Sequence, residues 1–409
     1  MKTDPLDWLV VGGGLHGVHL AARLIVETGV APSRLRIVDP ADRLLDTWLT
    51  RTERTGMQYL RSPSVHHIGV GPWDLERFAG KRKTRKPGMF AAPYSRPSLE
   101  LFNSHSQSVV DDLGLARLHV RAQVEECWPR TEGVRVILCN GRVLDAERAI
   151  LALGTSELAW PDWASRRSSH VVHIFDPGFA LKEPNSHIAV VGGGITAVQT
   201  ALTMEAEGKR VDLVSRHAPR QHQFDSDPGW LGPKRMAGFQ CVNDFSQRRQ
   251  MISQARHRGS APPDVMQRLR RALKKGRIRW RDSEVRELIP TEDGASLCFD
   301  DGSTLAVNQT VLATGVETRR PGGRLVDRMV DECGLRTADC GYPIVDRHLR
   351  WHPRVHLSGA LAELELGPTA RNIAGARRAA ARLVGLLRVE RAASGSAPAS
   401  PSVKPNDTD

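Results

Sequence analysis

DWLVVGGGLHGVHLAARLI, residues 7–25, is the stretch that decides the fold. An apolar run ends at Val11, three glycines follow, and apolar residues then recur at helical spacing. This order predicts a strand, a tight turn and a helix. Gly12, Gly14 and Gly17 stand in the pattern GxGxxG. The first glycine allows the turn, the second lets a pyrophosphate approach the backbone, and the third lets helix and strand pack closely. The stretch therefore predicts a dinucleotide-binding unit.

The next apolar run supports this interpretation. RLRIVDP, residues 34–40, predicts a second strand that ends at Asp39, 22 residues after Gly17. An acidic side chain at this distance can accept a hydrogen bond from a ribose hydroxyl. Strand, glycine turn, helix and acid together are a far more specific signal than the glycines alone.

The same unit occurs a second time, in residues 186–217. Gly192, Gly194 and Ala197 stand there as GxGxxA, again between an apolar run and a helical pattern. Two dinucleotide sites in one chain exclude most simple dehydrogenases, which need one. They are typical of proteins that pass a hydride from a nicotinamide nucleotide to a bound flavin.

The second unit lacks the acid of the first. Its second strand ends in Ser215 and Arg216, and an arginine can pair with a 2′-phosphate that a carboxylate would repel. We therefore expect NADPH rather than NADH at this site. Lys209 and Arg210 are candidates to assist Arg216.

The order of these motifs gives the expected architecture, an α/β fold with two Rossmann-like domains. Two apolar runs that end at Gly154 and Gly315 are expected to carry the chain from one domain to the other. The NADP domain is thus predicted to be inserted in the FAD domain. The predicted boundaries are 1–160 and 311–390 for the FAD domain, 161–310 for the NADP domain, 218–290 for a basic helical insertion within it, and 391–409 for a disordered tail.

The composition limits the class of protein. The 409 residues carry a formal charge of +12, concentrated in residues 81–86 and 220–286. Few aromatic residues lie among these basic residues, which argues against nucleic acid as a partner. No apolar run reaches membrane-spanning length and the first residues lack a signal-peptide pattern, so we expect a cytoplasmic protein. The basic insertion is expected to cover the site or attract an anionic substrate. Within it, a helix capped by Asp264 is expected.

The six cysteines form no CxxC pair and none stands at zinc-like spacing with histidines. His170 and His173 are three residues apart, but the residues around them predict a strand and no third ligand is evident. This argues against a disulfide framework, a structural metal and a dithiol reductase, which needs two thiols a few residues apart near the flavin. Electrons from a flavin would then pass to oxygen, to a small organic acceptor or to another protein.

The order GGGLHG, LALGT, GGGITA, LATG and SGALAELELGPTARNIAGARRAAARL resembles the two-dinucleotide-binding-domain flavoproteins, over about residues 6–388. Within that superfamily the chain is most similar to class B flavin monooxygenases and the L-lysine and L-ornithine N-hydroxylases. The narrower resemblance rests on Trp48 and on residues 55–63 (TGMQYLRSP), 93–102 (PYSRPSLELF) and 171–177 (VVHIFDP).

The resemblance implies FAD at the first site, NADPH at the second, and roles for individual residues. The implied FAD contacts are Gly12, Gly14, Gly17, Asp39, Trp48, Met57, Gln58, Leu60, Gly154, Gly359 and Pro368, with a helix beginning at Pro368. The NADP contacts are Gly192, Gly194, Ala197, Ser215 and Arg216. The candidates for substrate binding are Arg96 and Asn103, and those for catalysis are Arg61 and, from its position in VVH, His173.

The predicted function is that of an FAD- and NADPH-dependent monooxygenase. It would hydroxylate a heteroatom of a small metabolite through a C4a-hydroperoxyflavin, and nitrogen is the expected heteroatom. One alternative is an NADPH:acceptor oxidoreductase that passes electrons to a quinone, a small disulfide or a partner protein. A further alternative is a non-catalytic protein that binds flavin or nucleic acid.

Overall fold

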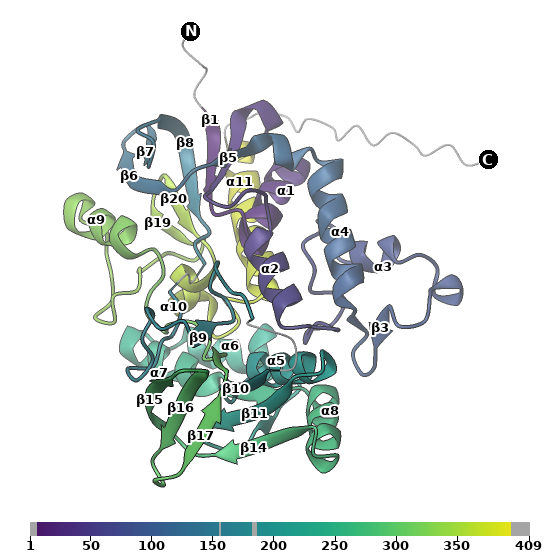
Figure 1. The fold of residues 1–409 in the computed structure, drawn as a ribbon. Coiled ribbons are helices and arrows are strands. Elements are labelled where there is room, and N and C mark those ends of the chain that lie inside the picture. The colour runs from purple at the N-terminus through teal and green to yellow at the C-terminus, as the bar shows by residue number, and fades with distance from the viewer. Residues whose placement is uncertain (1–5, 155–156, 182–185, 394–409) are drawn as a thin grey trace.

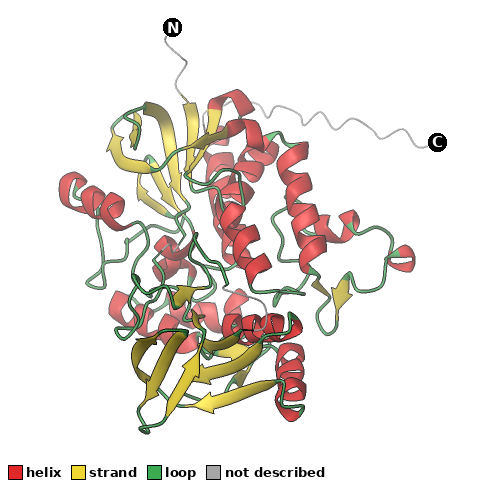
Figure 2. Cartoon of the chain, in the orientation of Figure 1, coloured by secondary structure: helices red, strands yellow, loops and turns green. Residues whose placement is uncertain are grey.

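The computed structural model describes residues 6–154, 157–181 and 186–393. It consists of two α/β domains, each built on its own sheet, with the first domain above the second in Figures 1 and 2. The first sheet has the order β19-β20-β8-β1-β2-β5, and the hairpin β6-β7 joins it through β8. Its strands are β1 (Leu6–Val11), β2 (Leu35–Asp39), β5 (His119–Arg121), β6 (Val124–Arg130), β7 (Gly133–Leu138), β8 (Val143–Leu151), β19 (Arg350–His352) and β20 (Val355–Leu357).

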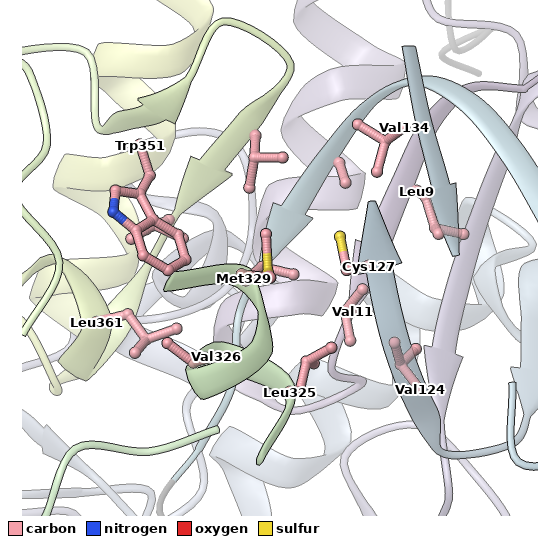
Figure 3. Packing of buried hydrophobic residues seen from close by; sticks show 14 of the residues in the cluster. Leu9, Val11, Val124, Cys127, Val134, Leu325, Val326, Met329, Trp351 and Leu361 are labelled. Carbon is pink, nitrogen blue, oxygen red and sulfur yellow. The ribbon is translucent and has the colours of Figure 1, made fainter. Parts of the chain in front are cut away.

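Apolar residues cover both faces of β1, as is typical of a strand in the middle of a parallel sheet. On one face, α1 (Leu15–Thr28) and α11 (Ile373–Ala393) lie side by side (Figure 1). On the other face, Leu9 of β1 belongs to one buried cluster with Cys127 of β6 and with Met329 of α9 (Gly323–Cys333), as Figure 3 shows.

The second sheet is parallel throughout, in the order β14-β11-β10-β18-β9. The strands of this domain are β9 (Val171–His173), β10 (His187–Val191), β11 (Arg210–Ser215), β14 (Ile278–Asp282) and β18 (Gln309–Leu312), with a separate antiparallel sheet of β15 (Val285–Thr291), β16 (Gly294–Phe299) and β17 (Thr304–Val307). Two helices, α5 (Ile195–Ala206) and α8 (Pro263–Lys274), pack against each other and share the buried apolar cluster of this sheet.

The remaining elements connect and flank the two sheets. The helices are α2 (Asp46–Arg54), α3 (Asp74–Phe78), α4 (Leu99–Asp112), α6 (Pro233–Gln240), α7 (Phe245–Ala255) and α10 (Glu363–Leu366). The short strands are β3 (Phe90–Ala91), β4 (Arg96–Pro97), β12 (Arg220–Gln221) and β13 (Ser260–Ala261), and the 3-10 helices are η1 (Pro32–Arg34), η2 (Arg82–Thr84), η3 (Leu115–Leu118), η4 (Pro228–Leu231) and η5 (Gly359–Ala362). No described helix is long and apolar enough to cross a membrane.

The predicted insertion of one domain into the other is confirmed, because β8 and β20 pair in the first sheet and the whole second sheet lies between them in sequence. Where the chain crosses, Leu158 and Val316 form an antiparallel bridge. On either side of it, the Ala159 N–H donates to the Gly315 carbonyl at 3.1 Å, and the Glu317 N–H donates to Glu157 at 2.9 Å.

Several predicted boundaries are wrong. The change of domain at 310/311 would cut through β18, which belongs entirely to the second sheet. The basic insertion does not extend over 218–290, because α8 and β14 are core elements of the second domain. The added segment is therefore the part from β12 to β13, which carries α6 and α7.

Helix ends also differ from expectation. The last helix begins at Ile373, not at Pro368, which lies in a turn. It continues to Ala393, so the predicted tail cannot begin at residue 391, and residues 394–409 lie outside the described part of the chain. Asp264 does not cap α8, because Pro262 holds the cap position and makes no side-chain hydrogen bond there.

Candidate functional site

The first glycine loop joins β1 to α1 and leaves an open space at the helix N-terminus. A Cβ on Gly12, where φ is +111°, would lie 2.5 Å from the Ala152 carbonyl oxygen, and a Cβ on Gly17 would lie 1.8 Å from that of Gly12. A Cβ on Gly14, by contrast, would meet nothing within 4 Å. The tight packing behind the loop and the free space in front of it fit a pyrophosphate held by the N-terminus of α1.

Asp39 braces this loop. Its carboxylate accepts hydrogen bonds from the backbone N–H of Gly13 at 2.6 Å and of Ala41 at 2.9 Å. A carboxylate has about four lone-pair positions, so these two bonds leave capacity for a ribose hydroxyl. Asp39 thus fixes the loop, a role that the sequence did not indicate.

A cavity of about 720 Å³ beside α2 brings together Met57, Gln58 and Asn103, which the sequence placed near the flavin or the substrate. The Trp48 indole Nε1 donates to the Asn103 Oδ1 at 2.9 Å, so these two side chains fix each other. Leu60 is only 2% exposed and does not line this cavity.

The closing segment of the first domain meets the glycine loop at His16. A Cβ on Gly359 would lie 3.6 Å from the His16 ring. The ring nitrogens lie 2.9 Å from the Ser358 hydroxyl and 3.1 Å from the Asn372 carbonyl, which can only accept. Burial lowers the pKa of His16 to about 4, so the ring is neutral, Nε2 carries the proton, and Nδ1 accepts from Ser358. The sequence analysis did not select His16, although its position inside the glycine pattern was a usable signal.

Gly154 and Pro368 were also expected near the flavin. Gly154 follows β8 at the edge of the described residues, and a Cβ there would meet nothing within 4 Å. Pro368 is buried in the turn before α11. Because the helix begins five residues later, the Pro368 position cannot supply the expected helix N-terminus; Asn372 stands directly before it instead.

The second glycine loop repeats the packing of the first. A Cβ on Gly192 would lie 2.5 Å from the Ala313 carbonyl oxygen, and Ala197 is fully buried beneath it. The loop also has a neighbour with no counterpart in the first domain. The His217 ring lies between Gly193 and Gly259, 2.9 Å from the Cβ position of either.

Ser215 and Arg216 lie at the end of β11 next to this loop. The buried Ser215 hydroxyl donates to the His217 carbonyl and accepts from the Trp280 indole. The Arg216 side chain is 76% exposed, with Glu284 at 3.6 Å as its ionic partner. Lys209 and Arg210 cannot assist it, because Arg210 starts the same strand and a strand of six residues separates its ends by roughly 17 Å.

A cleft of about 1120 Å³ runs between the domains and contains the second glycine loop. Its wall includes eight arginines, Arg61, Arg216, Arg220, Arg249, Arg256, Arg258, Arg286 and Arg371, and four carboxylates, Asp162, Glu284, Glu317 and Glu363. The surplus of positive charge suits a phosphorylated nucleotide or another anion. Much of it comes from the segment between β12 and β13.

Three of the predicted residues have structural partners instead of a free position in a cavity. Arg96, 1% exposed, pairs with Asp264 of α8 at 3.1 Å and lines neither cavity. His173 is fully buried on β9, and burial lowers its pKa to about 4, which leaves a neutral ring. Arg61 lines the cleft, but its donors are bonded to the second domain. Arg96 is therefore not placed as a free substrate ligand, nor Arg61 and His173 as free catalytic groups, and all three assignments stay predictions.

All six cysteines are free, and none lines either cavity. Cys127 is buried, and burial raises the pKa of its thiol to about 12, which keeps it protonated.

The two sheets, their glycine loops and the shared cleft define a protein with two dinucleotide-binding domains. Residues 9–156 match the profile of the FAD-NAD(P)-binding family, which confirms the prediction for the first domain. No curated protein matches the sequence significantly. Residues 9–156 thus carry an FAD-NAD(P)-binding domain, and the chain has the α/β fold with two dinucleotide-binding domains that the sequence analysis predicted.

Solved structures specify the fold further. An ornithine hydroxylase of Pseudomonas aeruginosa is similar with a TM-score of 0.74 at 17% identity, over 93% of this chain and 98% of that one. A cadaverine monooxygenase of Erwinia amylovora, in a structure bound to FAD, gives 0.70 at 14% identity, over 100% of both chains. A bacillithiol disulfide reductase of Bacillus cereus gives 0.61 at 16% identity, over 95% of this chain and 100% of that one.

Proposed function

We propose that the protein binds FAD in the first domain and NADPH in the second, and that it hydroxylates a nitrogen atom of a small metabolite. The observation that carries this proposal is the cleft, because its wall combines the second glycine loop with Arg61, Glu363 and Arg371 of the first domain. A nucleotide bound in the second domain would therefore face the first. Bound together, the two cofactors supply hydride transfer and the activation of oxygen.

The residues that would hold the cofactors follow from the geometry. The open space at Gly14 would take the pyrophosphate of FAD, and Asp39 its adenosine ribose. Met57, Gln58 and Asn103 would lie along the same cofactor where it enters the smaller cavity. The matching nucleotide contacts in the second domain are Gly192, Gly194, Ala197, Ser215 and Arg216.

Two observations support oxygen insertion over electron transfer to a protein disulfide. Two of the similar structures, with TM-scores of 0.74 and 0.70, are named an ornithine hydroxylase and a cadaverine monooxygenase, and both names indicate an amine as the substrate. In addition, none of the six cysteines lines the smaller cavity or the interdomain cleft, where a thiol would have to stand to receive electrons from the proposed cofactors. The surplus of arginine in the cleft supports a substrate with a negatively charged group.

The test is a screen of amines and amino acids, with and without a carboxylate, for stimulated NADPH oxidation. We expect one of them to give a product heavier by one oxygen atom, with NADPH, oxygen and product in equal amounts. NADPH oxidation that yields only hydrogen peroxide with every compound would contradict the proposal.

The similarity to a bacillithiol disulfide reductase keeps a second function open, that of an NADPH:acceptor oxidoreductase. Its acceptor would be a quinone, a small disulfide or a partner protein. Anaerobic assays decide between the two functions, because turnover with a quinone or a low-molecular-weight disulfide in the absence of oxygen supports only the second.

A further inference from the structure

Arg61 makes an unusual set of contacts across the domain boundary. Its Nε donates to the Gln223 carbonyl at 2.8 Å, and its Nη2 lies 2.7–2.9 Å from the carbonyls of His222 and Phe224 and from the Ser260 hydroxyl. In return, the Gln223 amide donates to the Arg61 carbonyl at 3.2 Å. One guanidinium thus binds the ends of both β12 and β13, with the planar fork that lysine cannot reproduce.

Along the backbone, Arg61 is connected to residues of the smaller cavity. Met57 and Gln58, which line the smaller cavity, precede it by four and three residues in the same irregular segment. The intervening Leu60 is fixed, since its N–H donates to the Pro97 carbonyl at 2.9 Å and its side chain is buried. A displacement of Arg61 would therefore be transmitted to the wall of the predicted flavin site.

Through its side chain, Arg61 is connected to the second glycine loop. Ser260, bonded to Arg61, directly follows Gly259. The Gly259 Cα lies 3.8 Å from the Cβ position of Gly194, and the His217 ring separates Gly259 from Gly193. Two consecutive residues, Ser260 and Gly259, thus connect the Arg61 side chain to the loop that would hold the nucleotide pyrophosphate.

The loop that Arg61 holds also contacts the first domain a second time. Asp225 follows Phe224 and accepts from the Asn372 amide at 3.2 Å, directly before α11. Burial lowers the pKa of Arg61 and the neighbouring Asp225 opposes that shift, as expected for a cation enclosed between two domains. Arg256 lies 3.5 Å from the other oxygen of Asp225.

We propose that Arg61 is a positioning residue that sets the distance between the two nucleotide sites and thereby the rate of hydride transfer. This inference rests on the proposed binding of FAD and NADPH, but it does not depend on where the electrons go afterwards. Arg61 would act through the 222–225 segment and Ser260, without touching the reacting atoms. Because displacements of about 1 Å can reduce rates roughly a hundredfold, the link has measurable consequences.

The experiment measures flavin reduction in the FAD-loaded enzyme without oxygen, using stopped-flow mixing with saturating NADPH. For Arg61→Gln we expect the limiting rate constant to fall by about ten- to a hundredfold. The FAD content and the reduction by dithionite should stay as in the wild type, because neither depends on the position of NADPH. Arg61→Lys should be intermediate, since one ammonium reaches fewer of the acceptors.

Arg54→Gln is the matched control. Arg54, at the end of α2, also donates to carbonyls of the second domain, those of Ile174, Asp176 and Pro177, but these follow β9 and lie outside both cavities. We expect its limiting rate constant to stay within about threefold of the wild type. Equal slowing by Arg54→Gln and Arg61→Gln would overturn the proposal in favour of a general loosening of the interface.

Two further results keep the test decisive. Guanidinium ion at low millimolar concentration should restore part of the rate in Arg61→Ala, and a wild-type rate in Arg61→Ala without it would overturn the proposal. If Arg61→Gln retains no FAD, the limiting rate of flavin reduction is measured in FAD-loaded Arg61→Lys instead. A rate equal to that of the wild type in this variant would overturn the proposal. A wild-type enzyme that NADPH does not reduce would instead refute the proposed function itself.

Discussion

Gly14 and Gly17 belong to one motif, yet a methyl group should leave the fold intact at Gly14 and disrupt it at Gly17. Gly14→Ala meets no protein atom within 4 Å and has φ of −77°, which alanine adopts freely. We expect this variant to fold with an unchanged Tm and to lose FAD, because the methyl group occupies the space for the pyrophosphate. The ratio of flavin to protein absorbance measures the loss.

Gly17→Ala is the comparison, since its Cβ would lie 1.8 Å from the Gly12 carbonyl oxygen. Helix α1 would have to move away from β1, so this variant should lose folded protein as well as FAD. Full flavin content in Gly14→Ala would show that the first site is not where the pyrophosphate binds.

Substitutions of Arg216 and Glu284 are expected to change the KM for NADPH in opposite directions. Removing the arginine in Arg216→Ala deletes one charge-assisted hydrogen bond to a 2′-phosphate, which contributes about 1.5–3 kcal/mol. The KM for NADPH should therefore rise by roughly ten- to a hundredfold, with that for NADH unchanged. Glu284→Gln should lower the KM for NADPH, because Glu284 competes for the same guanidinium at 3.6 Å. Equal effects on both nucleotides would contradict the assignment.

At this scale, the sequence predicted the backbone positions of the site better than its side chains. Gly12 and Gly17 stand where close packing admits no side chain, whereas Gly14 borders open space, and both situations produce the same recognisable glycine pattern. The side chains of Arg61 and Arg96 bind partners that the sequence did not indicate, because a long side chain can reach acceptors in several directions. The acceptors that such a side chain reaches depend on where the second domain lies, and the local sequence motif does not indicate this.

At the scale of elements, Glu363 fixes helix α7 to the closing segment of the first domain. It is only 1% exposed and pairs with Arg249 of α7 and with Arg371 at 2.7 Å. Glu363→Gln leaves two arginines without their buried partner, so we expect a loss of about 3–5 kcal/mol in the free energy of unfolding. Urea unfolding monitored by circular dichroism measures it.

Glu365→Gln is the control for that prediction. Glu365, two residues away, also pairs with two arginines, Arg248 and Arg382, but its side chain is 16% exposed. Water can compensate part of the loss there, so the cost should be clearly smaller. A larger loss in Glu365→Gln than in Glu363→Gln would show that burial does not determine the strength of these pairs.

Element boundaries were harder to predict than the elements. The apolar stripe of Val265 and Leu269 was visible in sequence, but the arginines around it suggested an external insertion instead of the core helix α8. Similarly, a proline is favourable in a first helical turn, yet α11 begins at Ile373 because the chain first turns between α10 and α11. Local preference cannot fix a boundary that packing with distant segments decides.

At the scale of the whole molecule, stability should depend on pH through six histidines, of which five are buried and one, His16, is half-buried. Burial lowers the pKa to about 3 in His19 and to about 4 in the other five, which are His16, His67, His105, His173 and His356. In the unfolded chain they titrate near 6.5, so between about pH 6.5 and 4 only the unfolded state binds these protons. Their contribution is complete above pH 6.5 and decreases as the pH falls.

The slope is at most about 1.4 kcal/mol per pH unit for each histidine. We therefore expect Tm to be nearly constant from pH 8 to 7 and to fall steeply from pH 6.5 to 5, measured in buffers of equal ionic strength. A Tm that does not fall in that interval would show that these rings are accessible to protons in the folded state.

The two-domain architecture could be predicted from the sequence because each domain contains a complete unit of strand, glycine turn and helix. The interdomain cleft could not be predicted in this way, since its arginines come from stretches of both domains that lie far apart in the sequence. Charge clustering along the sequence indicated a basic region, but only the folded chain shows which of these charges face the same space.

The paired connectors between the domains have a practical meaning for protein engineering. Because Leu158 and Val316 lie opposite each other, the second domain starts and ends at one place on its surface. Its whole parallel sheet therefore behaves as a cassette with adjoining ends, which could be exchanged for the corresponding domain of a related enzyme through only two neighbouring junctions. Nucleotide preference would then become a property that is transplanted as a block, with the contacts around Arg61 as the surface that the donor must match.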